Sequence, residues 1–497
     1  MNQQYPMPQG ETAYPQTRWR ALAVLLIASF MNMIDVTIVN VALPSLQRNL
    51  GATSSGIEWV VAAYIMAFAL GLLPFGRLGD TFGHRRIFLW GVAAFTIAST
   101  FCGMATSIEV LIAARVLQGV AGAMMTPQTL AIAQVIFPPR ERGSAFALFG
   151  LSAGLAAVTG PIAGGLLVDA NLFGMEWRPI FLVNIPVGIL AIFAGLRYLP
   201  PLPGERALGI DLGGIFLAGI TMVLAVFPLV EGREAGWPAW CFWMLAASIP
   251  AAIAFVFWQR RQNSHDRPQL FPVVLLSNGQ FMLGTLVSTA FFSAVPSFFF
   301  VLAMFLQIGF GLSPIESGLT TVPFSVGVLV SSLVSGRFAG RYSRERMIAG
   351  AVMLVCAMLA LRWLITTIGD SIDHWLFLPP LLLGGLGLGT TISPLFQTVL
   401  STVPGRDAGS ASGGLQAFQQ VGGAIGVATV GQMFFARLAE GMAAGGNPHP
   451  AFIAALEWSL VYTISAFSVV IVAALFLKRP QGHGGPSARP EPAPVAD

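Results

Sequence analysis

The chain has 497 residues, of which 55% are hydrophobic and only 10% are charged, and its mean hydropathy is +0.74. Soluble domains carry about a quarter of charged residues, so this composition excludes an ordinary soluble protein. The formal net charge of +4 comes from basic residues dispersed through short loops, which excludes a basic nucleic-acid-binding stripe. The three cysteines and five histidines lie singly, without disulfide or metal-ligand spacing, so we expect no metal and no cofactor.

Fourteen apolar segments, each long enough to cross a bilayer, predict an all-α integral membrane protein. They lie at about 20–43, 57–76, 86–105, 108–136, 143–168, 179–199, 212–230, 238–258, 279–307, 315–337, 346–367, 375–400, 408–434 and 456–477. The polar, proline-rich N-terminus (1–19) and the Gly/Pro/Ala-rich tail (478–497) are expected to be disordered.

The basic residues of the loops predict the orientation. With a cytoplasmic N-terminus, 20 of the 26 Lys and Arg residues fall on the cytoplasmic side, and only Arg115 remains in the membrane. Both termini are therefore expected in the cytoplasm of a cell with a plasma or bacterial inner membrane. The loop that opens with Gly76-Arg77 recurs 260 residues later as Gly336-Arg337, which predicts two six-helix halves.

The first segment carries a carboxylate, Asp35, deep in an apolar run. An ionisable group costs several kcal/mol there, so it marks a functional site unless the helix end is misplaced. With the helix ending at Pro44, Asp35 lies about 13 Å from its outer end. Asn32 shares its helical face and Asn40 follows on the same segment.

The fourth segment carries Arg115, followed at helical spacing by Gln118, Gly122, Thr126 and Thr129. Arg115 lies about 10 Å from the outer end of this segment, so its depth matches that of Asp35. We expect the two charges to pair; the alternative is that Arg115 snorkels to the outer surface.

The fifth segment has small residues at spacings of four and seven, which let helix backbones approach closely. Gly150, Gly154, Pro161 and Gly165 fall on one side of this helix, where Pro161 is expected to add a kink. The same pattern also occurs in ordinary helix packing.

Together these motifs resemble the fourteen-helix drug:proton antiporter branch of the major facilitator superfamily, from about residue 20 to 477. The run from Asp35 to Pro44 is similar to the helix-one motif of that branch, and Arg115, Gln118 and Gly119 are similar to its helix-four motif. The other similar positions are those of the gating loop (Gly76, Asp80, Gly83, Arg85, Arg86), the helix-five antiporter motif (Gly150, Gly154, Gly160, Pro161, Gly164, Gly165), and Trp177-Arg178 with Phe181 and Asn184. Thr81 and His84 replace the usual basic residues of the gating loop, so the charge network around Asp80 is expected either to be weaker or to use Arg85 and Arg86.

The resemblance implies an N-terminal six-helix bundle (20–199), two inserted helices with flanking loops (200–278) and a C-terminal six-helix bundle (279–477). The resemblance implies that the protein is not an enzyme. It implies instead a proton-coupled exporter of amphipathic or lipophilic compounds, that is, a multidrug antiporter that works by alternating access. Asp35 and Arg115 would couple the proton, and the expected substrate pathway includes Asn32, Asn40, Gln118 and Thr126. The alternatives are the same fold exporting one endogenous metabolite, peptide or lipid and, less favoured, a proton-driven importer. A periplasmic adaptor protein would suit a double-membrane cell, and the sequence leaves the envelope type open.

Overall fold

The computed structural model describes residues 16–52, 54–171, 174–232, 235–337, 342–367, 372–443 and 448–477. Each of the fourteen apolar segments forms helix. The long helices are α1 (Arg18–Leu50), α2 (Ser54–Phe82), α3 (His84–Gly103), α4 (Ile108–Ile136), α5 (Pro139–Asp169), α7 (Asn184–Tyr198), α8 (Leu212–Glu231), α9 (Ala239–Ser264), α11 (Gly279–Met304), α12 (Pro314–Arg337), α13 (Ser343–Ile365), α14 (His374–Ser401), α15 (Ala408–Ala443) and α16 (Pro448–Leu475).

The helices are long and apolar enough for a polytopic membrane protein. Among the described residues, thirteen helical spans meet the length and hydropathy of a membrane crossing; one of them joins the short α6 (Pro179–Leu182) to α7. The 31-residue α5, some of whose side chains lie outside the described set, is a further long helix. A short α10 (Val273–Ser277) precedes α11, and a π-helical turn, Phe305–Gly309, extends it.

The expected end of the first helix at Pro44 is wrong. The helix continues to Leu50, where Gly51 ends it in the left-handed conformation (φ 60°), the usual role of glycine after a helix. Asp35 therefore lies 15 residues, or about 23 Å, from that end. It sits close to the middle of the 33-residue helix. We call the two ends of the molecule the Arg18 end and the Leu50 end, after the first and last residues of α1.

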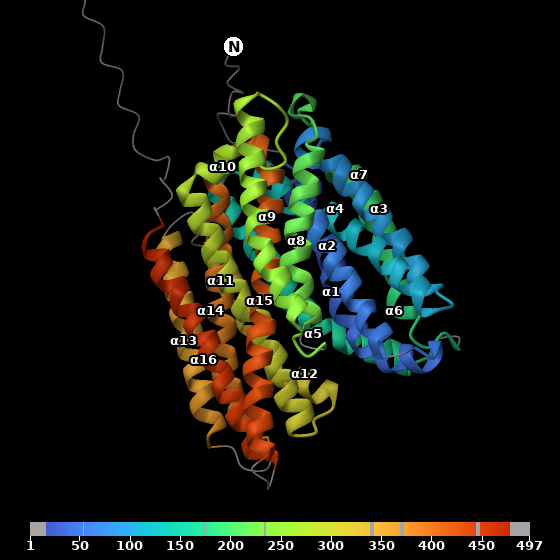
Figure 1. Cartoon of the computed structure of the whole chain (residues 1–497), viewed down its shortest axis with the longest axis vertical. Coiled ribbons are helices and arrows are strands. Elements are labelled where there is room, and N and C mark those ends of the chain that lie inside the picture. Colours follow the sequence, from blue (N-terminus) through green and yellow to red (C-terminus); the bar gives the residue numbers. More distant parts are fainter. Residues whose placement is uncertain are drawn as a thin grey trace, which may run out of the picture.

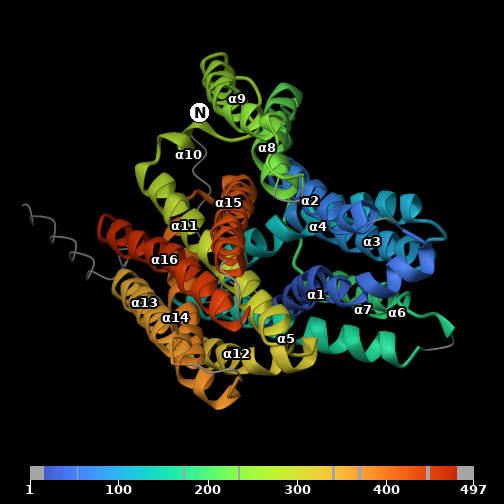
Figure 2. The same ribbon diagram turned by 60° about the horizontal axis from the view of Figure 1, so that its bottom comes forward.

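The helices pack into two groups, with a hairpin beside them (Figures 1 and 2). In the N group (α1–α7), α4 packs on α2 and α3, while α1 packs on α5. In the C group (α11–α16), α14 packs on α12 and α13, and α11 packs on α15. The α8–α9 hairpin contacts α2 and α15 through α8, so it touches both groups.

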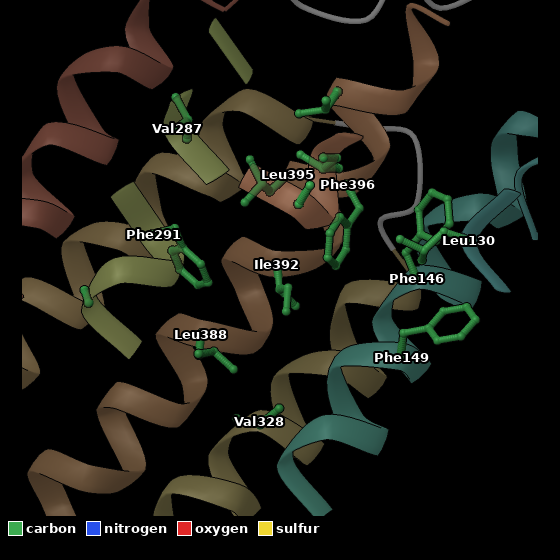
Figure 3. Packing of buried hydrophobic residues seen from close by; sticks show 14 of the residues in the cluster. Leu130, Phe146, Phe149, Val287, Phe291, Val328, Leu388, Ile392, Leu395 and Phe396 are labelled. Atoms are coloured by element: carbon green, nitrogen blue, oxygen red, sulfur yellow. The ribbon is translucent and has the colours of Figure 1, made fainter. Parts of the chain in front are cut away.

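The two groups meet toward the Arg18 end, where α5 packs on α12 and α14 while α2 packs on α15. Buried apolar side chains fill this junction: Phe146 of α5 lies edge-on to Phe396 of α14 at 6.3 Å between ring centroids, beside Phe149 and Ile392 (Figure 3). At the Leu50 end the groups diverge, and Figure 1 shows the ends of α15 and α16 well away from those of α1 and α6. The expected residue boundaries of the bundles stay a prediction.

Candidate functional site

A buried ion pair lies inside the N group. The Arg115 guanidinium of α4 donates to the Asp35 carboxylate of α1 at 2.5 Å, and the side chains are 1% and 0% exposed. Arg115 therefore does not snorkel to the surface. Its Nε donates to the carbonyl of Val60 on α2 at 3.0 Å, which fixes the direction of the guanidinium.

Three further donors and acceptors complete the surroundings of the carboxylate. Gln118 donates to Asp35 at 2.7 Å while its amide oxygen accepts from Arg115 at 2.7 Å, so it bridges both members of the pair. Asn184 of α7 donates to Asp35 at 3.2 Å. Ser99 of α3 accepts from both amides, at 2.8 and 3.3 Å. The polar network therefore draws on α1, α3, α4 and α7.

An aromatic ring closes the network on its α2 side. The guanidinium of Arg115 lies over the Tyr64 ring, 4.2 Å from its centroid, and the Tyr64 hydroxyl accepts from Asn32 at 2.8 Å. A desolvated cation over a tyrosine face gains about 2 kcal/mol or more. Tyr64 thus stabilises the cation while Gln118 and Asn184 satisfy the anion.

Thr126, another residue expected along a substrate pathway, bonds within its own helix and not to this network. The Thr126 hydroxyl donates to the carbonyl of Gly122 in its own helix at 2.8 Å, and Thr129 bonds in turn to Thr126. The side chain of Asn40 lies outside the described residues.

The small residues of α5 lie against different neighbours along the helix. A side chain at Gly150 would meet Ile392 at 2.8 Å, and one at Gly154 would touch Val328 at 3.5 Å, both in the C group. A side chain at Gly160 would collide with Thr37 of α1, whereas Gly165 faces open space. Gly150 and Gly154 thus both face the C group, while Gly160 packs on α1; a common side for Gly150, Gly154, Pro161 and Gly165 stays a prediction. Gly164 is buried, and the side chain of Pro161 lies outside the described residues.

The last turns of α2 and the turn into α3 join the two groups at the Arg18 end. Asp80 accepts hydrogen bonds from the backbone amides of Gly409 and Ser410 at 2.7 and 2.8 Å and from the Ser410 hydroxyl at 2.5 Å. These groups form the N-terminus of α15, where unpaired amides and the helix dipole favour an anion. Gly76 brings α2 so close to α15 that a side chain there would collide with the Gly409 carbonyl.

The expected contacts of Asp80 with Arg85 and Arg86 are not found. Arg85 donates to the carbonyl of Leu196 at 2.7 Å, and Arg86 is exposed. His84 instead lies 3.6 Å from Asp80 and bonds through Nδ1 to Gln128 at 2.9 Å.

Two further residues shape this loop. Gly83 has a φ of 100°, a conformation that favours glycine, at the turn into α3. Arg77 forms an ion pair across the groups, 3.7 Å from Asp407.

Several functional candidates escaped the sequence reasoning. The run Asp407-Ala408-Gly409-Ser410 offers an acid and a small-residue helix start, a recognisable signal for a charged contact. Glu457 is a second carboxylate within the apolar segments; it pairs with Arg362 at 2.9 Å, and both side chains are partly exposed. Asp211 begins α8 and accepts from Trp258 and Gln259 of α9, at 2.9 Å each, which ties the hairpin together.

Two packed helix groups, one of which holds a buried and partnered carboxylate within a long apolar helix, are typical of a secondary transporter. Residues 25–427 match the family described as the Major Facilitator Superfamily. The chain belongs to this superfamily, which makes it a multi-pass membrane transporter and not an enzyme.

Named relatives support this membership. The chain is 40% identical over 440 residues to a probable actinorhodin transporter of Streptomyces coelicolor (87% of this chain, 76% of that protein). It is 32% identical over 436 residues to the multidrug resistance protein Stp of Mycobacterium tuberculosis (87% and 78%). The solved structure of the proton:xylose symporter XylE shares the fold, with a TM-score of 0.64 at 13% identity over 94% of this chain and 96% of that one.

Proposed function

We propose that the protein exports amphipathic or lipophilic compounds in exchange for protons, by alternating access between the two helix groups. The Asp35–Arg115 pair supports this proposal most strongly. A fully buried carboxylate near the middle of α1 is costly, and an apolar residue would fill the same space at lower cost, so the charge indicates a function. The relatives named for multidrug resistance and for single natural products support export.

In this mechanism Asp35 is the proton acceptor and Arg115 its counter-ion. When Asp35 is ionised, it is held by Arg115, Gln118 and Asn184. Protonation removes the negative charge, and Arg115 keeps the Val60 carbonyl, the Gln118 amide oxygen and the Tyr64 ring as partners. The pair can therefore open without leaving the guanidinium unsatisfied, and α1 becomes free to move relative to α4.

The contacts between the groups support a state closed at the Arg18 end. Asp80 would act as the latch on α15, while Gly150 and Gly154 of α5 would form the surface on which the C group rocks. The substrate pathway would include Asn32, Asn40, Gln118 and Thr126, with an apolar wall from the aromatic cluster of Phe298, Phe299 and Phe324.

A second candidate is export of one endogenous product. It is favoured by the names of the actinorhodin and tetracenomycin C relatives, each of which refers to a single natural product. A susceptibility panel separates the two: a multidrug exporter protects host cells against several unrelated lipophilic compounds, and a proton uncoupler abolishes the protection. Protection against one chemical class only would favour the second candidate.

The proposed topology has fourteen crossings, as two six-helix bundles (20–199 and 279–477) and an inserted pair within 200–278. The Arg18 end and both termini would face the cytoplasm, in a plasma or bacterial inner membrane, because most loop arginines lie at that end. In a double-membrane cell the Leu50 end would face the periplasm, where an adaptor protein could bind.

Thiol labelling tests the orientation. With Cys102, Cys241 and Cys356 replaced, a cysteine at Thr366, an exposed residue beyond α13, should react in intact cells with a membrane-impermeant reagent. A cysteine at Ser264, exposed at the end of α9, should react only after the cells are opened. The opposite pattern would reverse the orientation.

A further inference from the structure

The His84 side chain lies at the junction between the two helix groups. His84 begins α3 and is only 7% exposed. A side chain at Gly79 of α2 would lie 2.8 Å from its ring, and one at Gly409 of α15 would lie 2.9 Å from it. The imidazole is therefore packed between a helix of the N group and a helix of the C group, beside Asp80.

The hydrogen bonds of Gln128 determine which ring nitrogen of His84 carries a hydrogen. The Gln128 amide nitrogen donates to the Phe75 carbonyl at 2.7 Å, so the amide oxygen is the atom that faces His84 Nδ1 at 2.9 Å. That oxygen can only accept, and Nδ1 must therefore be the donor. Turning the amide round would place its oxygen against the Phe75 carbonyl, where two acceptors repel each other. Nδ1 thus carries a hydrogen in both charge states of the ring.

The other ring nitrogen faces the latch. His84 Nε2 lies 3.6 Å from Asp80 Oδ1, the same oxygen that accepts the backbone amide of Gly409. In the neutral ring, Nε2 holds a lone pair and repels the carboxylate. In the imidazolium, Nε2 carries a hydrogen and a share of the positive charge, so it attracts the carboxylate. The charge of His84 therefore decides whether this contact strengthens or weakens the hold of Asp80 on α15.

The charges near the latch come from several elements. Among the described residues, the others are Arg77 of α2, Arg85 and Arg86 of α3, Glu205 of the segment before α8, and Arg406 and Asp407 of the turn before α15. The arginines stay charged at every physiological pH. Histidine is the side chain whose unperturbed charge changes between about pH 5 and 8. Variants of His84 separate its titration from that of the carboxylates.

We propose that His84 is a positioning residue that makes the latch sensitive to pH. The protonated ring holds Asp80 against the start of α15, and loss of the proton lets the Arg18 end open more readily. With that end in the cytoplasm, an acidic cytoplasm keeps the exporter closed on this side, which limits further proton entry by exchange. This inference rests on the proposed role of Asp80 as the latch.

Distance measurements at two pH values test the proposal, with spin labels at Arg197 of α7 and Ser401 of α14, both exposed at the Arg18 end. Without substrate, the ratio of open to closed molecules should rise about tenfold from about pH 6 to about pH 8, equivalent to about 1.4 kcal/mol. His84→Asn keeps a donor for Gln128 and removes Nε2, whereas His84→Gln places a neutral donor toward Asp80. Both variants should lose the pH response, and the Asn variant should be the more open.

Two controls locate the response. His265→Asn changes an exposed histidine at the same end, which bonds to the Arg261 carbonyl, and it should keep the wild-type pH response. The response should also persist in Asp35→Asn, where the central carboxylate cannot titrate. Thermal melting checks that each variant is folded, and if one His84 variant is not, the other decides.

The outcomes separate the role of His84 from that of the latch. Asp80→Asn should be open at both pH values; if it stayed closed, the latch and this inference would both be wrong. If Asp80→Asn opens but the His84 variants keep the wild-type pH response, Asp80 remains the latch and the role of His84 is overturned. Loss of the response in Asp35→Asn would assign it to Asp35 and would overturn the proposal as well.

Discussion

At the scale of single residues, Arg115 is what makes a buried carboxylate at Asp35 tolerable. Removing one member of a buried ion pair typically costs about 3–5 kcal/mol, because the other charge is left unpaired. Here Arg115 donates hydrogen bonds to Asp35 of α1, to Gln118 of its own helix α4 and to the Val60 carbonyl of α2.

A double-mutant comparison tests this coupling. Arg115→Gln alone should destabilise the protein by about 3 kcal/mol or more, because Asp35 remains buried without a cation. The double variant Asp35→Asn/Arg115→Gln should recover most of this loss, as both charges are absent. Thermal unfolding in detergent measures both. Additive losses in the double variant would contradict a coupled pair.

Sequence reasoning predicts the pair but not its surroundings. Counting residues along the apolar segments predicts that Asp35 and Arg115 lie at similar depth, but α1 runs six residues past Pro44, so the distances from the observed helix ends, about 23 and about 10 Å, do not match. The contacts of Gln118, Ser99, Asn184 and Tyr64 depend on how four helices are rotated about their axes. A single sequence carries no measure of that rotation.

At the scale of elements, α5 links the two groups with different parts of its length. Gly150 and Gly154 face α12 and α14, while Gly160 faces α1. The spacing of small residues predicts close packing, but the helix that packs on each glycine follows only from the tertiary arrangement. In the same way, the acid of the gating loop is visible in the sequence, whereas its partner, the start of α15, lies more than 300 residues away.

Alanine substitutions in α5 separate tight from open positions. Gly160→Ala places a methyl group against Thr37, whose hydroxyl bonds to Ile34 at 3.0 Å and to Ala156 at 3.3 Å. Overpacking of this kind costs about 1–3 kcal/mol, so stability and transport should both fall.

Gly165→Ala is the matched control. Its methyl group enters open space, so the variant should resemble the wild type in melting temperature and in transport rate. If Gly160→Ala also left the melting temperature and the transport rate unchanged, the contact between α5 and α1 would not be close.

At the scale of the whole molecule, the two groups are held together at the Arg18 end and diverge at the Leu50 end (Figure 1). Asp80 contributes charge-assisted hydrogen bonds across this junction. Such bonds are worth about 1.5–3 kcal/mol each, so weakening them shifts the balance between closed and open states by tenfold or more.

Distance measurements test this latch. In Asp80→Asn, spin labels at Arg86 of α3 and Ser401 of α14, both exposed at the Arg18 end, should move apart in a large fraction of molecules without substrate. A second pair, Arg86 and Arg197, lies within the N group and should keep its distance. An unchanged distance between the first pair would show that Asp80 does not hold the groups together.

The role of Asp35 is tested most directly in proteoliposomes, with a compound that the susceptibility panel identifies. Two rates are measured for wild type, Asp35→Glu and Asp35→Asn: exchange of labelled compound at equal pH, and its accumulation driven by a pH gradient. The account predicts that Asp35→Asn still exchanges the compound but no longer accumulates it, whereas Asp35→Glu retains part of both. Accumulation by Asp35→Asn that still collapses with an uncoupler would contradict the assignment of Asp35 as the proton-coupling residue.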